Sequence, residues 1–538
     1  MAGKRDVREI CVEACPTRPR LLFSTHMQIR LAFLCFAFVA LAHGQTVLVK
    51  PYVQPGDGGS LSGTDVKVLE WLTDQRPGEF TVEYGIEGQP ARTAEVERTK
   101  LEFDGPKAKP AATPKPAEPP KANPAKDPAL TLDELKAKSI ASFPTVVEHE
   151  QHYLRYRAQL TELPFDSVVS YKVKLGETVV REGTFKTRVS AEKTVRFVAV
   201  GDLAGNTLEQ RTIAFQISLQ KPDFLVALGD IVYPGGRVLQ YMNHFFPVYN
   251  DVATPGRKTG APLMASVPIY PVIGNHDADM QKLSEWPDAF AAFYFFSVPK
   301  NGPGIGPWNL PLGNNAKNAA QFRKLAGAEY PAVCDYSFDY GPAHVCCVDA
   351  NKYTMDGLQE LAGWIEKDLA ESKQPWKFIC FHQPAFHTSR EHYSEQGMRL
   401  LEPMFERLGV NVVFAGHVHN YQRSKPFTFT PNPPKRNPRG LVDGDFVLDE
   451  NYDGIINTKP KGVIHIISGG GGAQLYKGDL AKLAEAIKKE HAQNYYDITA
   501  KYISDKHGFS VIELTPTSFE LRQISIDGKE VDRFRITK

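Results

Sequence analysis

The spacing of apolar positions divides the chain into two parts with different strand patterns. In residues 47–103 and 146–187, apolar and polar positions alternate over short runs such as Val66–Leu72 and Phe80–Tyr84, with turn residues between the runs. Alternation with a period of two is typical of strands that bury one face only. These runs predict a small β-sandwich within residues 45–190.

The pattern changes from residue 194 onward. The strand-like apolar runs no longer alternate with polar residues, and segments of helical length separate them. Strands that are buried on both faces, in sheets covered by helices, give this pattern. Residues 191–538 therefore predict a layered α/β domain. Stretches rich in Gly, Pro and Asn near 298–318 and 424–460 are predicted to be loops, long enough to cover a site.

A proline-rich stretch interrupts the first part of the chain. Residues 106–128 contain 8 Pro, 6 Ala and 5 Lys. Such a composition cannot bury an apolar core. We predict a disordered surface insertion. Its lysines are compatible with contact to an anionic polymer or a cell envelope, but a solvated linker is the simpler interpretation.

The N-terminus has the pattern of an export signal. Residues 31–42 form an apolar run of 12, preceded by Arg30 and followed by small residues. This run is too short to span a bilayer and fits a signal peptide. We predict a signal peptide over residues 1–44, cleaved before Gln45, and a secreted or periplasmic protein with no integral membrane segment after cleavage. A start at the second methionine would make residues 1–26 an overlong gene start.

Composition and charge exclude several classes of protein. The chain has 538 residues, of which 42% are hydrophobic and 23% charged. These values exclude a chain that is disordered throughout, a collagen-like repeat and a membrane bundle. The 63 Lys and Arg balance 62 Asp and Glu, so no nucleic-acid partner is expected. The composition leaves the oligomeric state open.

The cysteines do not suggest a thiolate metal site. Cys334, Cys346, Cys347 and Cys380 lie outside the predicted signal peptide, and no Cys-x-x-Cys pair occurs. Since two of the surrounding runs are apolar and strand-like, buried free thiols are at least as well supported as disulfides. The sequence also has no Asn-x-Ser/Thr acceptor, which favours a bacterial exported protein over a glycosylated eukaryotic one.

Five predicted strands of the second part end in polar residues of a similar kind. These residues are Asp202, Asp230, Asn275 with His276, His382, and His417 with His419. Ligands of layered α/β sheets bind beyond the carboxyl ends of the strands, so these strand ends are expected to meet in one crevice. A single ending of this kind is usually a capped turn, but five together are hard to explain in that way.

These residue types favour a metal centre. Carboxylates, imidazoles, an amide and the phenol of Tyr233 form a ligand set suited to iron, manganese or zinc. His417 and His419, two positions apart in an extended segment, project to the same side. If Asp230 bridges two ions, Asp202 and Tyr233 place further anionic oxygens on one ion, while the other ion receives neutral ligands. The first ion would then tolerate a charge of +3 and the second a charge of +2.

At these residues the chain resembles the calcineurin-like metallophosphoesterases. The run Gly229–Tyr233, with a tyrosine where most of the superfamily differs, resembles the purple acid phosphatase branch, and the predicted sandwich is similar to the fibronectin type III-like N-terminal domain of that branch's larger members. The first motif departs from the family at Ala204, where a second glycine is usual, and the fourth begins with Ile379 instead of valine. Neither departure replaces a ligand.

The resemblance implies a fold and a set of metal ligands. The fold is a metallophosphoesterase β-sandwich flanked by helices. A binuclear centre would contain Fe³⁺ and a divalent ion, which is Fe²⁺, Zn²⁺ or Mn²⁺. The implied ligands are Asp202, Tyr233 and His419 for Fe³⁺, Asp230 as the bridge, and Asn275, His382 and His417 for the divalent ion.

The resemblance also implies an activity. An exported acid phosphatase would hydrolyse phosphate monoesters of small molecules by attack of a metal-bound hydroxide. His276 and His392 are the candidate catalytic residues, since an imidazole can hydrogen-bond the phosphate and protonate the leaving oxygen. Alternatives remain: His276 held by Asp277 outside the substrate site, and His387 in place of His392.

Two other functional classes stay open. The same metal core can cleave phosphodiesters or nucleotides. A non-catalytic surface-binding protein is less well supported because every implied ligand is present. No Gly-x-Ser-x-Gly elbow indicates a serine hydrolase, and the run Gly469–Gly472 lacks the ending of a P-loop. We expect this glycine run to allow close backbone approach near the metals.

Overall fold

The computed structural model describes residues 45–103, 152–280, 282–303, 312–327 and 334–538. The predicted signal peptide and the proline-rich insertion lie outside these residues. Among the described helices, none has the length and apolar character needed to cross a membrane.

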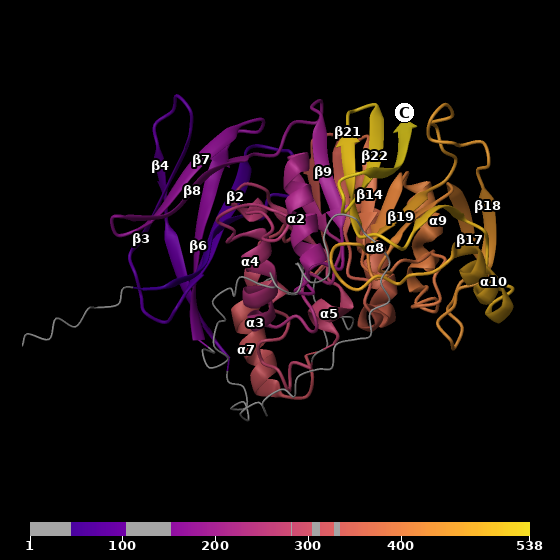
Figure 1. The fold of residues 1–538 in the computed structure, drawn as a ribbon, viewed down its shortest axis with the longest axis horizontal. Helices are drawn as coiled ribbons and strands as arrows, with labels where there is room; N and C mark the ends of the chain where they lie inside the picture. Colours follow the sequence, from indigo (N-terminus) through magenta and orange to yellow (C-terminus); the bar gives the residue numbers. More distant parts are fainter. Residues whose placement is uncertain (1–44, 104–151, 281, 304–311, 328–333) are drawn as a thin grey trace, which may run out of the picture. The chain divides into compact units, whose positions relative to one another are not determined.

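Two four-stranded antiparallel sheets form the N-terminal part (Figure 1). The first has the order β1 (Val47–Gln54), β2 (Asp65–Thr73), β6 (His152–Leu163) and β5 (Val96–Glu102), and the second β4 (Arg92–Ala94), β3 (Phe80–Ile86), β7 (Val168–Leu175) and β8 (Thr178–Lys186). Their apolar faces share one core, in which the ring of Trp71 lies 5.1 Å from that of Phe80. The relation to fibronectin type III domains and the boundary at residue 190 remain predictions.

Two larger sheets pack face to face in the second part. The six-stranded sheet has the order β11 (Ile269–Pro271), β10 (Phe224–Ala227), β9 (Val195–Val200), β21 (Gly508–Leu514), β22 (Ser518–Ser525) and β23 (Glu530–Thr537). The seven-stranded sheet has the order β12 (Tyr336–Tyr340), β13 (Ala343–Cys347), β14 (Trp376–Cys380), β15 (Val412–Ala415), β19 (Ile464–Ser468), β16 (Tyr421–Ser424) and β20 (Thr499–Ile503). Phe197 of β9 meets Phe378 of β14 between them, with 5.9 Å between ring centroids.

Helices cover the outer faces of both sheets (Figure 1). Ile213 and Ile217 of α2 (Leu208–Gln220) share a core with β9, and Leu361 and Ile365 of α8 (Leu358–Glu371) share another with β13, β14 and α9 (Glu402–Arg407). The predicted layer order, a sandwich flanked by helices, is confirmed. The remaining described α-helices are α3 (Val238–Gln240), α4 (Phe246–Tyr249), α5 (Asn275–Ala278), α6 (Ala292–Phe295), α7 (Ala316–Ala326) and α10 (Leu480–Glu490).

Residues 424–460 are not simply a loop, so this prediction was wrong. They contain an antiparallel hairpin of β17 (Phe427–Pro431) and β18 (Gly444–Leu448). The alternation of buried Phe427 and Phe429 with threonines is the strand signal. The connection between the two strands contains Asn432, Pro433, Pro434, Asn437 and Pro438, half of the prolines and asparagines of this stretch.

The four cysteines of the described chain are free and buried. Cys347 and Cys380 are register partners on the neighbouring strands β13 and β14. Burial raises the pKa of the Cys334, Cys346 and Cys380 thiols well above the usual value, so these thiols stay neutral and unreactive. The expectation of buried free thiols agrees with this arrangement.

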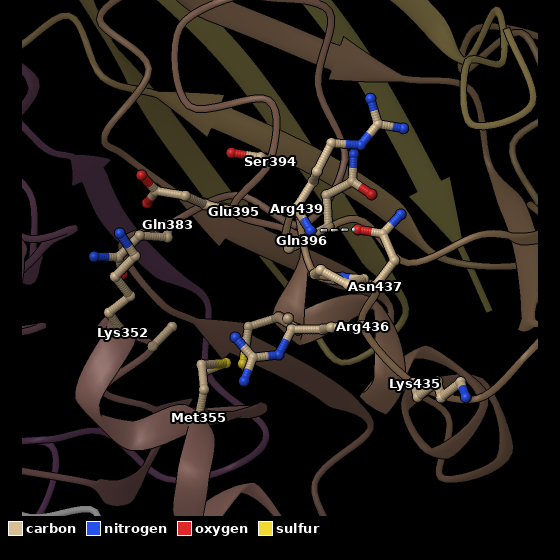
Figure 2. Close-up of a pocket in the computed structure, with 15 residues that line it drawn as sticks. Lys352, Met355, Gln383, Ser394, Glu395, Gln396, Lys435, Arg436, Asn437 and Arg439 are labelled. Atoms are coloured by element: carbon tan, nitrogen blue, oxygen red, sulfur yellow. Dashed lines mark hydrogen bonds between the residues drawn. The ribbon is translucent and has the colours of Figure 1, made fainter. Parts of the chain in front are cut away.

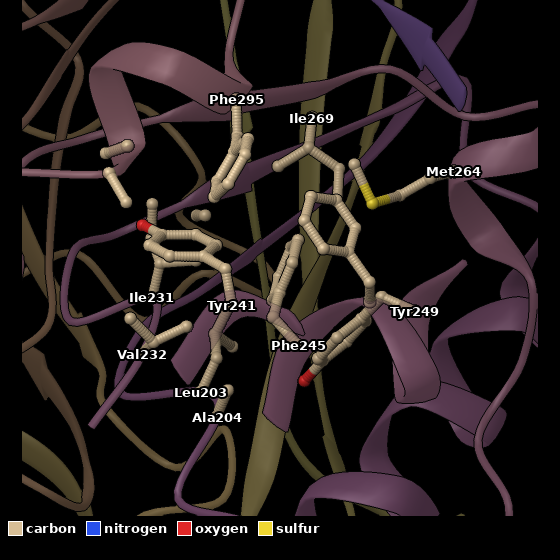
Figure 3. Close-up of a cluster of buried hydrophobic side chains, with 14 of the residues drawn as sticks. Leu203, Ala204, Ile231, Val232, Tyr241, Phe245, Tyr249, Met264, Ile269 and Phe295 are labelled. Carbon is tan, nitrogen blue, oxygen red and sulfur yellow. The ribbon is translucent and has the colours of Figure 1, made fainter. Parts of the chain in front are cut away.

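An apolar core, rich in aromatic rings, supports two of the strand ends (Figure 3). Leu203 directly follows Asp202, and Ile231 directly follows Asp230; both apolar side chains are fully buried, in a cluster that includes Phe245. Packed neighbours of this kind fix the backbone on the C-terminal side of each carboxylate. The apolar core therefore fixes the positions of the polar side chains of Asp202 and Asp230.

Candidate metal centre

The strand ends predicted from the sequence meet in one place. Asp202 follows β9, Asp230 follows β10, Asn275 follows β11, His382 follows β14, and His417 and His419 follow β15. Within the described chain, three groups have ligand atoms within 4.8 Å of one another: Asp202, Asp230 and His419; Asp230, His382 and His417; and His392, Glu395 and His417. The first two groups share Asp230.

One side of the centre is rich in oxygen ligands. The Tyr233 hydroxyl lies 3.0 Å from Oδ1 of Asp202, 3.0 Å from Oδ2 of Asp230 and 3.2 Å from Nε2 of His419. The same Nε2 is 3.2 Å from Oδ1 of Asp202. This set of two carboxylates, a phenol and an imidazole suits a highly charged, hard cation.

The other side is rich in neutral ligands. Nε2 of His382 lies 3.2 Å from each of three atoms: Oδ1 of Asp230, Oδ1 of Asn275 and Nδ1 of His417. Asp230 thus turns Oδ2 toward the oxygen-rich group and Oδ1 toward this one. The donor set fits two metal ions that share the Asp230 carboxylate.

Hydrogen bonds to carbonyl groups orient two of the imidazoles. Nδ1 of His382 donates to the carbonyl of Leu228 at 2.7 Å, and Nδ1 of His419 donates to that of Gln474 at 2.7 Å. In both rings Nε2 faces the centre, and it carries the lone pair when the imidazole is neutral. His417 is turned the other way, because its Nε2 faces a carboxylate and its Nδ1 faces His382.

Three of the candidate ligands have a strained backbone. The φ angles of Asp202, Asp230 and His417 are 62°, 50° and 67°, a region that costs non-glycine residues about 1–3 kcal/mol each and is concentrated at functional sites. Close packing requires small neighbours: a Cβ on Gly229 would lie 2.4 Å from the His382 ring, and one on Gly469 would lie 2.8 Å from Oδ2 of Asp202. The glycine run therefore allows the close approach expected of it.

The side chains of the centre strongly perturb one another's ionisation. Burial raises the pKa of Tyr233 well above its usual value, and the charges of Asp202 and Asp230 raise it further. Burial opposes the ionisation of His382, but the charge and hydrogen bond of Asp230 outweigh it and raise its pKa to about 10. Metal binding must therefore displace protons from the phenol and from this imidazole.

His276 lies at the exposed edge of the centre. Its ring centroid is 4.4 Å from that of Tyr233, its Nδ1 donates to the carbonyl of Pro234 at 2.8 Å, and its Nε2 is 3.9 Å from Oδ2 of Asp230. Asp277 does not hold this imidazole. Its carboxylate accepts hydrogen bonds from the backbone N–H groups of Ile231 and Gly274.

His392, rather than His387, lies beside the centre. Its ring centroid is 3.8 Å from that of His417. His387 is buried against Tyr393, and this burial lowers its pKa to about 3. His387 is therefore a buried, neutral imidazole packed on Tyr393.

Sequence reasoning missed Glu395 and Tyr476. The Glu395 carboxylate joins His392 Nδ1, at 3.1 Å from Oε1, to His417 Nε2, at 3.2 Å from Oε2. The Tyr476 ring stacks on His419 with 4.3 Å between centroids. Glu395 gave one usable signal, because a carboxylate three residues beyond a candidate substrate histidine lies in the same loop. No pattern marked Tyr476.

Comparison with known proteins matches part of the chain to one family. Residues 195–421 match the model of the calcineurin-like phosphoesterases, and the chain contains a calcineurin-like metallophosphoesterase domain. Its homologues include purple acid phosphatases. Probable inactive purple acid phosphatase 27 of Arabidopsis thaliana is 25% identical over 293 residues, which cover 52% of this chain and 40% of that protein.

Two further matches cover more of the compared protein. A nucleotide pyrophosphatase/phosphodiesterase of Hordeum vulgare is 25% identical over 329 residues, which cover 59% of this chain and 73% of that protein. The solved structure of purple acid phosphatase PPD1 from yellow lupin (Lupinus luteus) seeds covers 90% of this chain and 74% of its own, with 18% identity and a TM-score of 0.57. The latter likeness concerns the fold alone.

Proposed function

We propose that the chain is an exported, binuclear metal-dependent acid phosphatase that hydrolyses phosphate monoesters. The observation that carries the proposal is the position of Asp230, which turns one carboxylate oxygen toward an oxygen-rich ligand group and the other toward a nitrogen-rich group. Asp202, Tyr233 and His419 would hold Fe³⁺, and Asn275, His382 and His417 would hold Fe²⁺, Zn²⁺ or Mn²⁺. The ions would supply Lewis acidity for water activation and for neutralising phosphate charge.

The histidines at the edge of the centre have separate tasks in this proposal. His276 and His392 donate hydrogen bonds to the phosphate oxygens, and His392 also gives a proton to the departing alkoxide. Glu395 orients His392 and His417 through its two oxygens. Burial opposes the ionisation of Glu395, but the hydrogen bonds of the two histidines hold its pKa well below the usual range, so it remains an anionic acceptor at acidic pH.

Other features support export and activity. The apolar run at residues 31–42 supports a signal peptide and a secreted or periplasmic location. The name of the Arabidopsis relative describes that protein as probably inactive. In this chain, by contrast, all seven proposed ligands lie within one group of contacts, which supports an active centre.

The test combines metal analysis, the visible spectrum and activity on one preparation of the purified chain. We expect about two metal ions per chain including iron, a visible absorption band that is lost on reduction with dithionite, and hydrolysis of 4-nitrophenyl phosphate that is fastest at acidic pH. Asp230→Asn should lose both metal and turnover, whereas the exposed Asp505→Asn should keep them. A metal-replete and active Asp230→Asn protein would refute the proposal.

A second candidate is a metal-dependent phosphodiesterase or nucleotide hydrolase. The observation in its favour is the similarity to the Hordeum vulgare protein, which is named a nucleotide pyrophosphatase/phosphodiesterase. A panel of 4-nitrophenyl phosphate, bis(4-nitrophenyl) phosphate and ATP distinguishes the two activities. Faster turnover of the diester or of the pyrophosphate bond than of the monoester would favour the second candidate.

A further inference from the structure

A cavity of 920 Å³ lies beside the loop that contains Glu395 (Figure 2). On one side it is lined by Glu395, whose carboxylate contacts the ligand His417, and by Gln383, which directly follows the ligand His382. On the other side it is lined by the segment 435–440 between β17 and β18. Cavities of this size hold small molecules. A compound whose phosphate binds at the metals can therefore extend into this space.

The lining is cationic. Lys352, Lys435, Arg436 and Arg439 all line the cavity, together with a single carboxylate, that of Glu395. Both oxygens of Glu395 already contact histidines. Among the ion pairs of the described residues, none involves any of these four cations. The four cations are exposed to solvent, and the charge of Lys352 also acts on the Asp279 carboxylate. The lining of the cavity therefore keeps a net positive charge.

The backbone that carries two of the arginines is held in place. Oδ1 of Asn437 accepts hydrogen bonds from the N–H groups of Arg439, at 2.9 Å, and Leu441, at 3.1 Å. Gly440, at a φ of 85°, packs so closely against Ser394 that a Cβ there would lie 2.4 Å from the Ser394 carbonyl oxygen. The cationic segment is therefore fixed against the loop that contains Glu395, so its positions are set before a ligand arrives.

We infer that this cavity binds the leaving group of the substrate, and that the leaving group carries at least one further phosphate group. The inference rests on the proposed phosphatase activity. A monoester of an uncharged alcohol would place all its negative charge at the metals and none beside the four cations of the cavity. A second phosphate can accept paired hydrogen bonds from the guanidinium group of Arg436 or from that of Arg439, the geometry that arginine favours.

The chemistry of this assignment is balanced. Water adds across the P–O bond of the phosphate at the metal centre, which yields inorganic phosphate and an alcohol. The phosphate in the cavity keeps its bonds and serves only to bind and orient. The substrate class is therefore an organic bisphosphate or a more highly phosphorylated small molecule, from which one phosphate is removed at a time.

Binding of non-hydrolysable probes tests this assignment without turnover. Alkane-1,ω-bisphosphonates with four to ten carbons are compared by calorimetry with the matching alkylphosphonates on the metal-loaded chain. At one or more lengths we expect the bisphosphonate to bind at least about tenfold more tightly, since each charge-assisted phosphate contact is of that order. This preference should fall to below about twofold in R436Q/R439Q and should decline with added salt in the wild-type chain.

The matched control is R533Q/R535Q. It removes two exposed arginines that pair with carboxylates on β22 and β23 and do not line the cavity. It should keep the wild-type preference. Equal affinity for bisphosphonates and monophosphonates at every length, or a preference that survives in R436Q/R439Q, overturns the inference. The salt dependence, measured on the wild-type chain, still tests it if the double variant does not fold.

Hydrolysis separates this inference from the proposed function. The ratio of kcat/KM for fructose 1,6-bisphosphate to that for fructose 6-phosphate should exceed about 10 in the wild-type chain and approach 1 in R436Q/R439Q. Hydrolysis of both sugars without preference overturns the inference and leaves the phosphatase proposal standing. An arginine-dependent binding preference in a chain that hydrolyses no phosphoester overturns the phosphatase proposal instead.

Discussion

The hydroxyl group of Tyr233 lies 3.0 Å from Oδ2 of Asp230. The two residues are three positions apart, yet their side chains converge because the backbone at Asp230 has a positive φ and Ile231 and Val232 are buried in the core between them. Burial and the neighbouring carboxylates keep the phenol protonated in the metal-free chain. Only a strongly charged cation at this position makes ionisation of the phenol favourable.

Tyr233→Phe is expected to remove the visible absorption band of the iron-loaded chain, because the band requires a phenolate bound to Fe³⁺. Metal content should fall little, since Asp202, Asp230 and His419 keep their oxygen and nitrogen atoms. The spectrum and metal analysis of one preparation measure both. Tyr476→Phe, whose ring stacks on His419, is the control and should keep the band. A Tyr233→Phe protein with an unchanged band would contradict the ligand assignment.

Glu395→Gln is expected to weaken binding of the second metal. The amide cannot provide the anionic acceptor that fixes His417 with Nδ1 toward the centre, and loss of such an orienting partner typically costs 10–100-fold in metal affinity or activity. Competition with a chelator measures the affinity, and the pH profile of kcat separates orientation from folding. Glu391→Gln is the matched control, because Glu391 lies in the same loop and contacts Ser389 rather than a ligand. Equal effects of the two substitutions would contradict the role of Glu395.

Most of the proposed centre could be predicted because its ligands follow strand ends. Asp202, Asp230, Asn275, His382 and His417 each follow an apolar run, and the carboxyl ends of parallel strands in such sheets meet at one edge. Local sequence therefore carried the information. Glu395 and Tyr476 lie on irregular segments whose positions depend on tertiary packing, so their approach to His417 and His419 has no local signature.

The cationic cavity could not be predicted from the sequence for a related reason. Its arginines lie in a stretch that composition marked only as a loop, whereas the alternation at Phe427 and Phe429 shows a strand of a hairpin. The hairpin determines the positions of Arg436 and Arg439, which lie in the connection between its two strands. Their relation to Lys352, more than 80 positions earlier, depends on packing between distant elements. The pattern of apolar and polar residues predicts individual strands and loops, but it does not predict how distant elements pack against one another.

A buried charge cluster connects the N-terminal sheets to the seven-stranded sheet, and Asp65→Asn is expected to destabilise the chain strongly. The Asp65 carboxylate accepts hydrogen bonds from Nζ of Lys67 at 2.5 Å and from Nε of Arg188 at 2.8 Å, and all three side chains are essentially unexposed. Arg188 also donates to the carbonyl of Asp339 on β12. Breaking a buried ion pair by removing one partner costs about 3–5 kcal/mol.

The measurement for this cluster is the thermal midpoint of unfolding. Asp65→Asn should lower it by several degrees, and the double variant D65N/K67M should recover part of the loss because one uncompensated cation is removed. Burial lowers the pKa of Lys67 to about 8 even with Asp65 present, so this lysine is the cation most easily lost. A double variant no more stable than Asp65→Asn would contradict the electrostatic explanation.

His344 is expected to make stability depend on pH in the alkaline range. Its Nδ1 and Nε2 each lie 2.8 Å from a carboxylate oxygen, of Asp339 and Asp368 respectively. Burial opposes protonation, but the two carboxylates outweigh it and raise the pKa of His344 from 6.5 to about 9. The folded chain therefore binds a proton more tightly than the unfolded chain does.

Because the pKa of His344 is higher in the folded chain than in the unfolded chain, its protonation stabilises the fold fully below pH 6.5. This stabilisation is lost as the pH rises through 9. The full contribution is about 3 kcal/mol. We expect the thermal midpoint of His344→Gln to lie several degrees below that of the wild-type chain at pH 6. This gap in thermal midpoint should narrow steadily up to pH 10. Ser337→Ala, which removes a hydrogen bond from a neutral hydroxyl group to Asp368, should give a much smaller change of the gap with pH. A gap for His344→Gln that stays constant with pH would show that the packing of His344, rather than its charge, determines its contribution to stability.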